Sequence, residues 1–170
     1  MKKPNKAYID GDILVYKTAF YTEAEGSHLI QSKFDRDLKY WIPEGVTDYE
    51  IAISCKRHDN FRSKEYPLYK SNRNKTHRPD TLGEVYDYVT ENYKVKTLPS
   101  LEADDILGIY ASKGKGIAVT IDKDLMGVYG WHFNPNKEEP VKFISKKEAE
   151  DFFLIQWLEI VLIVFPDYGE

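Results

Sequence analysis

Short apolar runs alternate along this chain with longer segments in which apolar residues recur every three or four positions. The runs are typical of buried strands, and the longer spacing is typical of amphipathic helices. Strands are predicted over residues 7–9, 50–54, 94–97 and 116–121, with a hairpin of 131–133 and 141–144, and helices over 13–23, 80–93, 101–112 and from 145. Residues 26–48 show no clear period. Strands that alternate with helices predict an α/β domain with helices on both faces of a mostly parallel sheet.

The length and composition fit one domain of this class. The chain has 170 residues, of which 42% are hydrophobic, enough for a sizeable core and too many for a disordered protein. Its single cysteine, Cys55, excludes a disulfide framework and a cysteine-built zinc site. The net charge of −4 argues against a general polycation. No apolar signal segment opens the chain, and the apolar run 160–165 is too short to span a bilayer, so we expect a cytoplasmic protein without a membrane contact.

Acidic residues gather where the predicted strands end and where one helix begins. They form two Asp-x-Asp pairs and one Glu-x-Asp-Asp group: Asp10 and Asp12, Asp122 and Asp124, and Glu102, Asp104 and Asp105. Because the carboxyl ends of parallel strands meet at one edge of a sheet, we expect these carboxylates to lie close together. Carboxylates this close repel one another unless a cation lies between them, and all-oxygen ligands favour Mg²⁺ or Mn²⁺. The alternative is that each group only caps a helix or forms a turn.

The segment 56–79, which we call the arch, is basic, whereas the rest of the chain is acidic. Eight basic residues are opposed by Asp59 and Glu65, a local balance of +6. The basic residues are Lys56, Arg57, Arg62, Lys64, Lys70, Arg73, Lys75 and Arg78. A basic strip with interleaved aromatic residues beside a two-metal site suits a nuclease, in which the metals hydrolyse a phosphodiester and the strip holds the phosphates. The alternative is a solvated charged loop.

Four segments resemble the 5′-to-3′ exonuclease family, which includes phage 5′-nucleases, the 5′-nuclease domain of bacterial DNA polymerase I and the flap endonucleases. Residues 8–12 are similar to its opening strand with a metal-binding Asp, and 61–73 to its Phe-Arg…Tyr-Lys-x-x-Arg stretch. Residues 101–108 are similar to its Glu-Ala-Asp-Asp helix, and 120–126 to its Asp-Lys-Asp-Leu segment. Order and spacing agree from about residue 7 to 158, so the resemblance is specific.

The resemblance implies a PIN-like three-layer α/β fold and Mg²⁺- or Mn²⁺-dependent hydrolysis of DNA from 5′ ends or flaps, in phage DNA replication or degradation. It also implies RNA in RNA–DNA hybrids as a further substrate, and a monomer in the host cytoplasm. The implied metal ligands are Asp10, Glu102, Asp104 and Asp105 for a first ion and Asp122 and Asp124 for a second. Asp12 is expected either to join them or to cap the following helix. The implied nucleic-acid contacts are Arg62, Tyr69, Lys70, Arg73 and Lys75, of which Lys70 and Arg73 would act on the scissile phosphate.

The chain departs from the family pattern at two places. Where the family has a second Asp after the strand before Phe-Arg, this chain has Ser54-Cys55, so one metal ligand is missing or replaced. Where the family continues with Thr-Gly-Asp-x-x-Asp-x-Ile-Pro-Gly and a helix–turn–helix-like DNA clamp, residues 158–170 differ. Codons can be chosen for residues 158–169 such that the same DNA, read in a neighbouring reading frame, encodes that motif. We therefore expect a catalytic domain over 1–157, an aberrant tail over 158–170 in place of the second acid cluster, and weak or no activity.

Three alternatives stay open from the sequence. The tail would be a terminal strand if its β-branched run were genuine. The chain would be a non-catalytic PIN-like module if it bound nucleic acid through the arch without cutting it. A toxin-type PIN ribonuclease fits the acids but does not explain residues 69–73. The four histidines show no metal-ligand spacing and are expected at the surface or in loops: His28, His58, His77 and His132.

Overall fold

A computed structural model describes residues 2–66, 68–70 and 76–164 of the chain, with side chains up to residue 155. Six strands of this part form one sheet, in the order β3-β2-β1-β4-β5-β6. The strands are β1 (Lys6–Asp10), β2 (Asp48–Ala52), β3 (Val95–Lys96), β4 (Ile117–Val119), β5 (Gly130–Phe133) and β6 (Lys142–Ile144). The helices are α1 (Gly11–Glu25), α2 (Ile30–Trp41), α3 (Phe61–Glu65), α4 (Leu82–Asn92), α5 (Ala103–Ser112) and α6 (Lys146–Val164), with short 3₁₀ turns η1 (Ser27–Leu29), η2 (Arg57–Asp59) and η4 (Lys123–Gly127).

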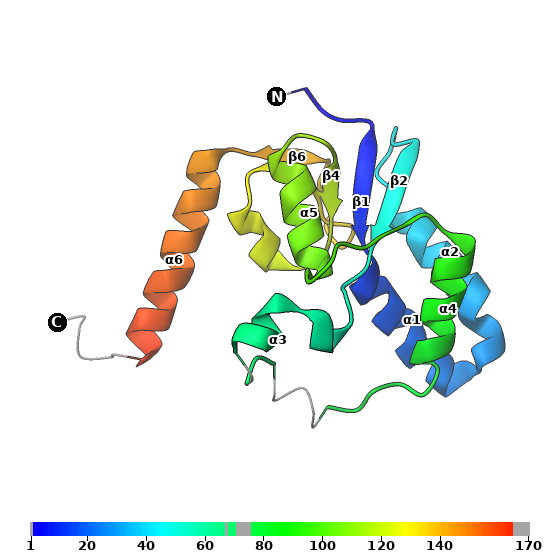
Figure 1. The fold of residues 1–170 in the computed structure, drawn as a ribbon. Coiled ribbons are helices and arrows are strands. Elements are labelled where there is room, and N and C mark those ends of the chain that lie inside the picture. The colour runs from blue at the N-terminus through cyan, green and yellow to red at the C-terminus, as the bar shows by residue number, and fades with distance from the viewer. Residues whose placement is uncertain (1, 67, 71–75, 165–170) are drawn as a thin grey trace.

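The sheet is parallel from β3 to β5, and β6 pairs with β5 in the antiparallel direction. In the centre of the sheet, Ile9 of β1 pairs with Ile51 of β2 and with Val119 of β4. All three side chains are fully buried, as a strand covered on both faces requires. This register brings the carboxyl ends of β1, β2 and β4 to one edge, where the chain leaves toward α1, the arch and η4 (Figure 1).

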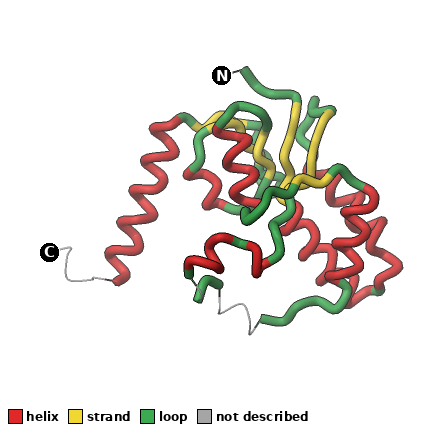
Figure 2. The backbone as a smooth tube through the Cα atoms, in the orientation of Figure 1, coloured by secondary structure: helices red, strands yellow, loops and turns green. Residues whose placement is uncertain are grey.

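Helices cover both faces of the sheet, so the predicted α/β three-layer architecture is confirmed (Figure 2). On one face α1, α2 and α4 pack together around Leu14, Phe34 and Val85, all fully buried. On the other face α5 packs on β1 and β4 through Ile106 and Leu107. Burial of each such side chain stabilises the fold by about 1.5–3 kcal/mol.

Helix α2 occupies part of the segment in which the sequence shows no clear period. Its buried positions are Ile30, Phe34, Leu38 and Trp41, which do follow helical spacing. The pattern is masked because Lys33 is also buried, on the same side of the helix, in an ion pair with Asp37. The arch, expected to be irregular, contains η2 and the short helix α3.

The last helix, α6, begins with the predicted capping box, in which the backbone N–H groups of Ser145 and Glu148 donate to each other's side chains. Phe153 of α6 packs against Gly127 of η4, where a side chain on the glycine would collide with the ring. The helix continues to Val164, so the alternative of a terminal strand over 160–165 is wrong for residues 160–164. Residues 165–170 lie outside the described part, and the frame-change hypothesis stays a prediction.

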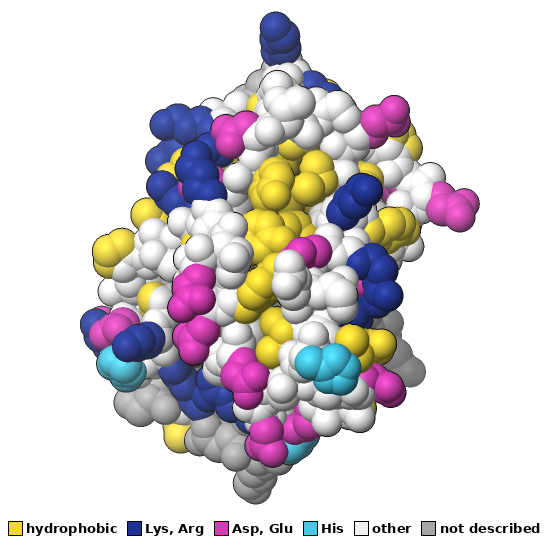
Figure 3. Space-filling model, turned by 90° about the vertical axis from the view of Figure 1, so that its right-hand side faces the viewer, with side chains coloured by type: hydrophobic (Ala, Val, Ile, Leu, Met, Phe, Trp, Pro, Cys, Tyr) yellow, Lys and Arg dark blue, Asp and Glu magenta, His cyan; other side chains and the backbone are white. Residues whose placement is uncertain are grey.

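The surface over α2 and α4 carries charged side chains of both signs around a central strip of hydrophobic ones (Figure 3). Among the described residues, no helix has both the length and the apolar character needed to cross a membrane.

Candidate active site

Asp10 ends β1 at the centre of the carboxyl edge and is 1% exposed. Its Oδ1 accepts a hydrogen bond from the N–H of Ile13, 3.3 Å away, and thereby caps α1. Its Oδ2 accepts a hydrogen bond from the Thr120 hydroxyl, 2.8 Å away. Burial, opposed by the Thr120 hydrogen bond and reinforced by the charges of Asp104 and Asp12, raises the pKa of Asp10 to about 7. Asp10 is therefore a buried carboxylate with no cationic partner among the described residues.

Asp12 does not cap α1, because Asp10 already does. Its carboxylate accepts hydrogen bonds from the N–H and the hydroxyl of Ser54 and from the Tyr86 hydroxyl, which lies 3.4 Å away. Ser54 in turn accepts a hydrogen bond from the N–H of Ala103 at the start of α5, 2.9 Å away. Burial, only partly offset by the Ser54 hydrogen bonds, raises the pKa of Asp12.

The Ser54-Cys55 position therefore joins three elements. Ser54 connects the end of β2 to α1 through Asp12 and to α5 through Ala103. Cys55 lies beside it, and its backbone N–H donates to the Leu101 carbonyl over 2.9 Å. Burial raises the pKa of the Cys55 thiol, which keeps it protonated and a poor metal ligand. The place of the family's second Asp is filled by a hydrogen-bonding residue.

Asp104 projects from the first turn of α5 toward the other acids. Burial, followed by the charge of Asp122 and opposed by Lys70, raises the pKa of Asp104 to about 6. Glu102 and Asp12 add to the rise, so carboxylates from α1, α5 and the segment after β4 act on one another. The predicted convergence of distant acids on one edge is seen for these residues.

Asp122 and Asp124 follow β4. The Asp122 carboxylate accepts a hydrogen bond from the Asp124 N–H, 2.9 Å away, and so caps η4. The N–H of Asp122 donates to the Thr120 hydroxyl over 3.0 Å, which ties this turn to Asp10. Asp124 is exposed, and its side chain makes no hydrogen bond or ion pair with any described residue. Asp122 thus belongs to the acid edge, and Asp124 lies outside the interacting group.

The arch closes over the acids through Arg62. Its two terminal nitrogens donate to the two carboxylate oxygens of Asp105, each over 2.7 Å, in a bidentate pair. The Asp105 carboxylate also accepts the N–H of Glu102 over 2.9 Å. Burial alone would raise the pKa of Asp105, but the hydrogen bonds from Arg62 and from the Glu102 N–H outweigh it and hold the pKa below its usual range.

Tyr69 and Lys70 bind the other arch-facing acid. The Tyr69 hydroxyl donates to Glu102 over 2.9 Å, and the Lys70 ammonium lies 2.8 Å from the same carboxylate. The arch is held in this position by Arg57, whose guanidinium donates to the Lys70 carbonyl over 3.2 Å. Lys70 has a φ of 52°, in the left-handed region that is unfavourable for a side-chain-bearing residue. The contact therefore forms at the cost of local backbone strain.

Three of the five residues predicted to bind nucleic acid are thus placed beside the acids. Arg62, Tyr69 and Lys70 pair with them directly, whereas Arg73 and Lys75 lie outside the described residues. Helix capping, the alternative for the acids, is confirmed for Asp10 and for the capping box of Glu102 and Asp105 on α5, and Asp122 caps a 3₁₀ turn. Capping and convergence on one edge occur together, because both need a carboxylate where a strand gives way to a helix.

A closed metal-binding group is not formed. Within the described ranges, no three or more His, Cys, Asp or Glu side chains lie close enough together to hold one ion. Sequence reasoning also missed how Ser54, Tyr86 and Thr120 organise the acids. Ser54 was noted only as a residue in place of an expected Asp, and Thr120 carried a signal as a hydroxyl residue directly before Ile121-Asp122.

Comparison with known proteins identifies the family of this chain. Residues 7–152 match the family model described as the 5′-3′ exonuclease, N-terminal resolvase-like domain. The crystal structure of T5 D15 protein co-crystallised with metal ions has a TM-score of 0.46 and 16% identity to this chain, over 76% of this chain and 53% of that one. The chain thus spans about half the length of that protein. No curated protein matches the chain. Because the family model covers most of the chain, the chain belongs to the 5′-3′ exonuclease family, and the matched part is the N-terminal resolvase-like domain of that family.

Proposed function

We propose that this domain hydrolyses phosphodiester bonds of DNA at 5′ ends or flaps with the help of Mg²⁺ or Mn²⁺. The observation that carries the proposal is the acid edge itself. Asp10 of β1 is buried and Asp104 of α5 is partly buried, and burial raises the pKa values of their carboxyl groups to about 7 and about 6. Two such groups are costly to bury unless a cation compensates them. DNA replication or degradation, and RNA in hybrids as a second substrate, are part of this proposal.

The residues fit a divalent cation by their chemistry. The donors are carboxylate oxygens, which Mg²⁺ and Mn²⁺ prefer. Mg²⁺ is commonly held by one or two carboxylates, with water and substrate phosphate completing the shell, so a closed group of three is not required. Asp10 and Asp104 would hold a first ion with Glu102 and Asp105 beside them, and Asp122 with Asp124 would hold a second. The ions would supply an activated water and stabilise the leaving oxygen.

The arch residues would bind the substrate. Arg62 and Lys70 already lie beside the acids, so a scissile phosphate at that edge would be within reach of their positive charges. In a site that excludes water, such cations stabilise the charge that develops on phosphate. A phosphate would compete with Glu102 and Asp105 for these groups. Arg73 and Lys75 are proposed as further contacts from sequence alone.

The proposal is tested with a labelled 5′-flap duplex and a matched blunt duplex, with the purified chain as a monomer. Because the expected second acid cluster and DNA clamp are replaced by residues 158–170, we expect only weak Mg²⁺-dependent release of 5′ products, none in EDTA, and loss of that cleavage in Asp10→Asn. Asp151→Asn is the control, because Asp151 is an exposed acid on α6, far along the chain from the site. Cleavage that persists in EDTA, or that Asp10→Asn leaves unchanged, would contradict the proposal.

A second candidate is a non-catalytic module that binds nucleic acid through the arch. It is favoured by one observation, that Glu102 and Asp105 are already neutralised by arch cations. DNA binding measured by fluorescence anisotropy in EDTA separates the two. For the module, Asp122→Ala leaves the affinity unchanged or tighter, and no product forms at any Mg²⁺ concentration.

A further inference from the structure

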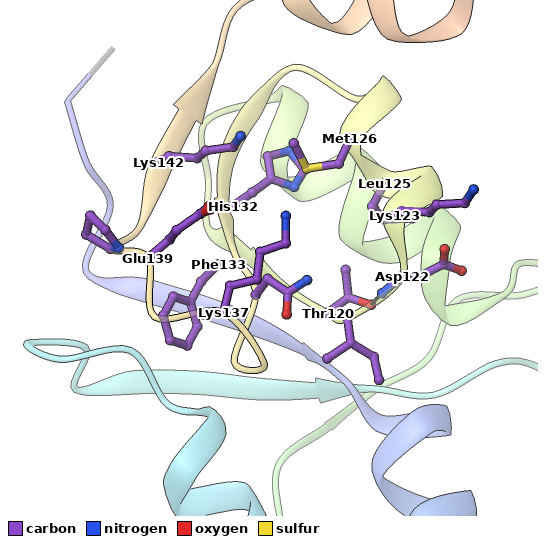
Figure 4. Close-up of a pocket in the computed structure, with 13 residues that line it drawn as sticks. Thr120, Asp122, Lys123, Leu125, Met126, His132, Phe133, Lys137, Glu139 and Lys142 are labelled. Atoms are coloured by element: carbon purple, nitrogen blue, oxygen red, sulfur yellow. Dashed lines mark hydrogen bonds between the residues drawn. The ribbon is translucent and has the colours of Figure 1, made fainter. Parts of the chain in front are cut away.

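A concave site lies next to the segment that carries Asp122. It is a pocket of about 160 Å³ between η4 and the β5–β6 hairpin (Figure 4). Its lining is mostly apolar, from Ile121, Leu125, Met126, Phe133 and Pro140. Ligand pockets commonly combine such a floor with a few polar groups that orient the ligand. The space suits one ring or sugar and its substituents, not a folded segment.

Two lysines reach over this pocket from the hairpin, Lys137 and Lys142, and the Glu139 carboxylate also points into it (Figure 4). Lys123 directs its ammonium away (Figure 4). Among the described residues, neither Lys137 nor Lys142 makes an ion pair or hydrogen bond through its ammonium. Asp122 also lines the pocket, so three lysines and two carboxylates give the lining a net charge of +1.

The backbone holds both lysines in place. The N–H of Lys137 donates to the Asn134 carbonyl over 3.1 Å, and the Asn134 side chain accepts the N–H of Asn136 over 2.9 Å. Lys142 lies on β6, directly opposite His132 in the antiparallel ladder. The charges therefore project from ordered backbone, which lowers the entropy lost when a ligand binds.

The pocket is joined to the acid edge through Thr120 and Asp122, which both line it. Thr120 lines the pocket, and its hydroxyl donates to Asp10 over 2.8 Å and accepts the N–H of Asp122 over 3.0 Å. A strand that crosses the acid edge from the arch would reach this pocket next.

We infer that the pocket binds one nucleotide of a nucleic-acid strand, with its phosphate at Lys137 and Lys142 and its base or sugar on the floor of Met126 and Phe133. Sites for single strands combine cations along the backbone with aromatic or apolar surfaces for bases. The inference rests on the proposed function only for the path of the strand. Its test uses binding, which does not depend on cleavage.

The first experiment is ¹³C-methyl NMR of methionine-labelled protein titrated with thymidine monophosphate in EDTA. The chain has two methionines, so the Met126 methyl gives an assignable local signal. We expect this signal to shift on addition of the nucleotide, and the shift to vanish in the double variant Lys137→Ala/Lys142→Ala. The matched control is Lys113→Ala/Lys115→Ala, which removes two exposed lysines at the opposite end of β4.

The second experiment measures the binding of a fluorescent thymidine octamer against salt. The double variant should bind roughly tenfold more weakly and lose about 0.7 of the logarithmic salt slope for each phosphate contact removed. Glu139→Gln removes the carboxylate that points into the pocket from the hairpin and should tighten binding severalfold. A gain in affinity is not produced by partial unfolding, so this variant keeps the inference falsifiable if the double variant folds poorly.

The results separate the two proposals. The protein cleaves DNA in the first outcome, but its Met126 signal does not shift with the nucleotide, or the double variant binds as tightly as its control. This outcome contradicts the nucleotide-binding pocket and leaves the proposed nuclease function supported. Lysine-dependent binding without any cleavage supports the pocket and overturns the nuclease. An equal, lysine-dependent shift with a hexaglutamate peptide would show a general anion site and overturn the assignment to a nucleotide.

Discussion

The acids at the carboxyl edge fall into two groups that differ in what compensates them. Glu102 and Asp105 face the arch, and each is paired with cationic groups at hydrogen-bond distance. Asp10 is buried and Asp104 is partly buried, and no described cation forms an ion pair with either, although the charge of Lys70 acts on Asp104. We call Asp10 and Asp104 the deep group, and Glu102 and Asp105 the arch-facing group. The pKa of Asp105 is lowered, whereas burial raises the pKa values of Asp10 and Asp104 to about 7 and about 6.

This difference shows where the fold already supplies positive charge and where it does not. In the arch-facing group the protein's own arginine and lysine neutralise the carboxylates. In the deep group, no ion pair with a described cation offsets the free energy that burial of the carboxylates costs. A destabilised group retained at a strand end is typical of a functional site, because evolution tolerates the cost where a ligand offsets it.

The strongest test removes the charge of the deep group. Asp10→Asn keeps the shape and an oxygen that can accept the Ile13 N–H, while its NH₂ group can donate to the Thr120 hydroxyl, but the side chain carries no negative charge to bind a cation. We expect cleavage to fall by roughly 100-fold or more. In EDTA at pH 8, the free energy of unfolding of this variant should exceed that of the unchanged protein by on the order of 2 to 4 kcal/mol. The reason is that the folded pKa, about 7, lies above the unfolded value, so the ionised form destabilises the fold above pH 7.

Urea denaturation and the flap assay measure the two effects on one preparation. Glu102→Gln is the comparison, because it removes a carboxylate that cations already compensate. It should destabilise the protein. If Asp10→Asn were also destabilising in EDTA, the contrast between the two groups would be wrong.

A buried histidine outside the acid edge tests how burial shifts the pKa of a base, which it lowers, whereas it raises the pKa of an acid. His132 on β5 is 5% exposed, so the expectation that it lies at the surface or in a loop is wrong. Burial, opposed by the hydrogen bond to the Val128 carbonyl and reinforced by the charge of Lys142, lowers the pKa of His132 to about 4. The unfolded chain takes up this proton near pH 6.5 and the folded chain only near 4, so stability falls as pH drops through that window.

The expected loss from His132 is about 2 kcal/mol at pH 5 relative to pH 7.5. It is measured by urea denaturation at several pH values. His132→Gln should flatten this part of the curve, whatever its effect on stability at pH 7.5. An unchanged slope in the variant would show that burial does not control this group.

The sequence was sufficient for the architecture because most elements carry their own hydrophobic period. The strand of Ala7 to Ile9 and the helix from Ala103 were placed by apolar runs, spacing and end signals. Helix α2 was missed, since the buried Lys33 interrupts the apolar side that Phe34 and Trp41 belong to. A propensity pattern does not show that a lysine is buried beside its own partner.

The candidate site could be predicted only in part, for a related reason. That Asp10, Asp104 and Asp122 share an edge follows from strand order and register alone. The pairing of Arg62 with Asp105 does not follow from strand order, because it depends on side-chain distances that the tertiary fold sets. The hydrogen bonds of Ser54 to Asp12 and Ala103 could not be predicted either, since the sequence showed only that an expected Asp is absent at this position.

The arch-facing group is tested by breaking its bidentate pair. Arg62→Ala leaves Asp105 without its main compensating charge and should lower the free energy of unfolding by about 1 to 2 kcal/mol. Arg62→Lys should recover only part of this, because an ammonium cannot match both carboxylate oxygens. Arg78→Ala, an exposed arginine without a described ion pair, is the control. Equal stability of the first and last variants would show that the arch does not stabilise this group.

The smallest expected effect concerns the residue that holds the two groups in register. Ser54 joins Asp12 beside the deep group to Ala103, next to the arch-facing Glu102. Ser54→Ala leaves the Ala103 N–H without its acceptor and removes one of the three donors to Asp12, which should cost about 1 kcal/mol in urea denaturation. Ser112→Ala is the matched control, since that hydroxyl bonds only within α5, to the Ile109 carbonyl. If both serines cost the same, Ser54 acts within its own segment, and the two groups of acids are held together by sheet register alone.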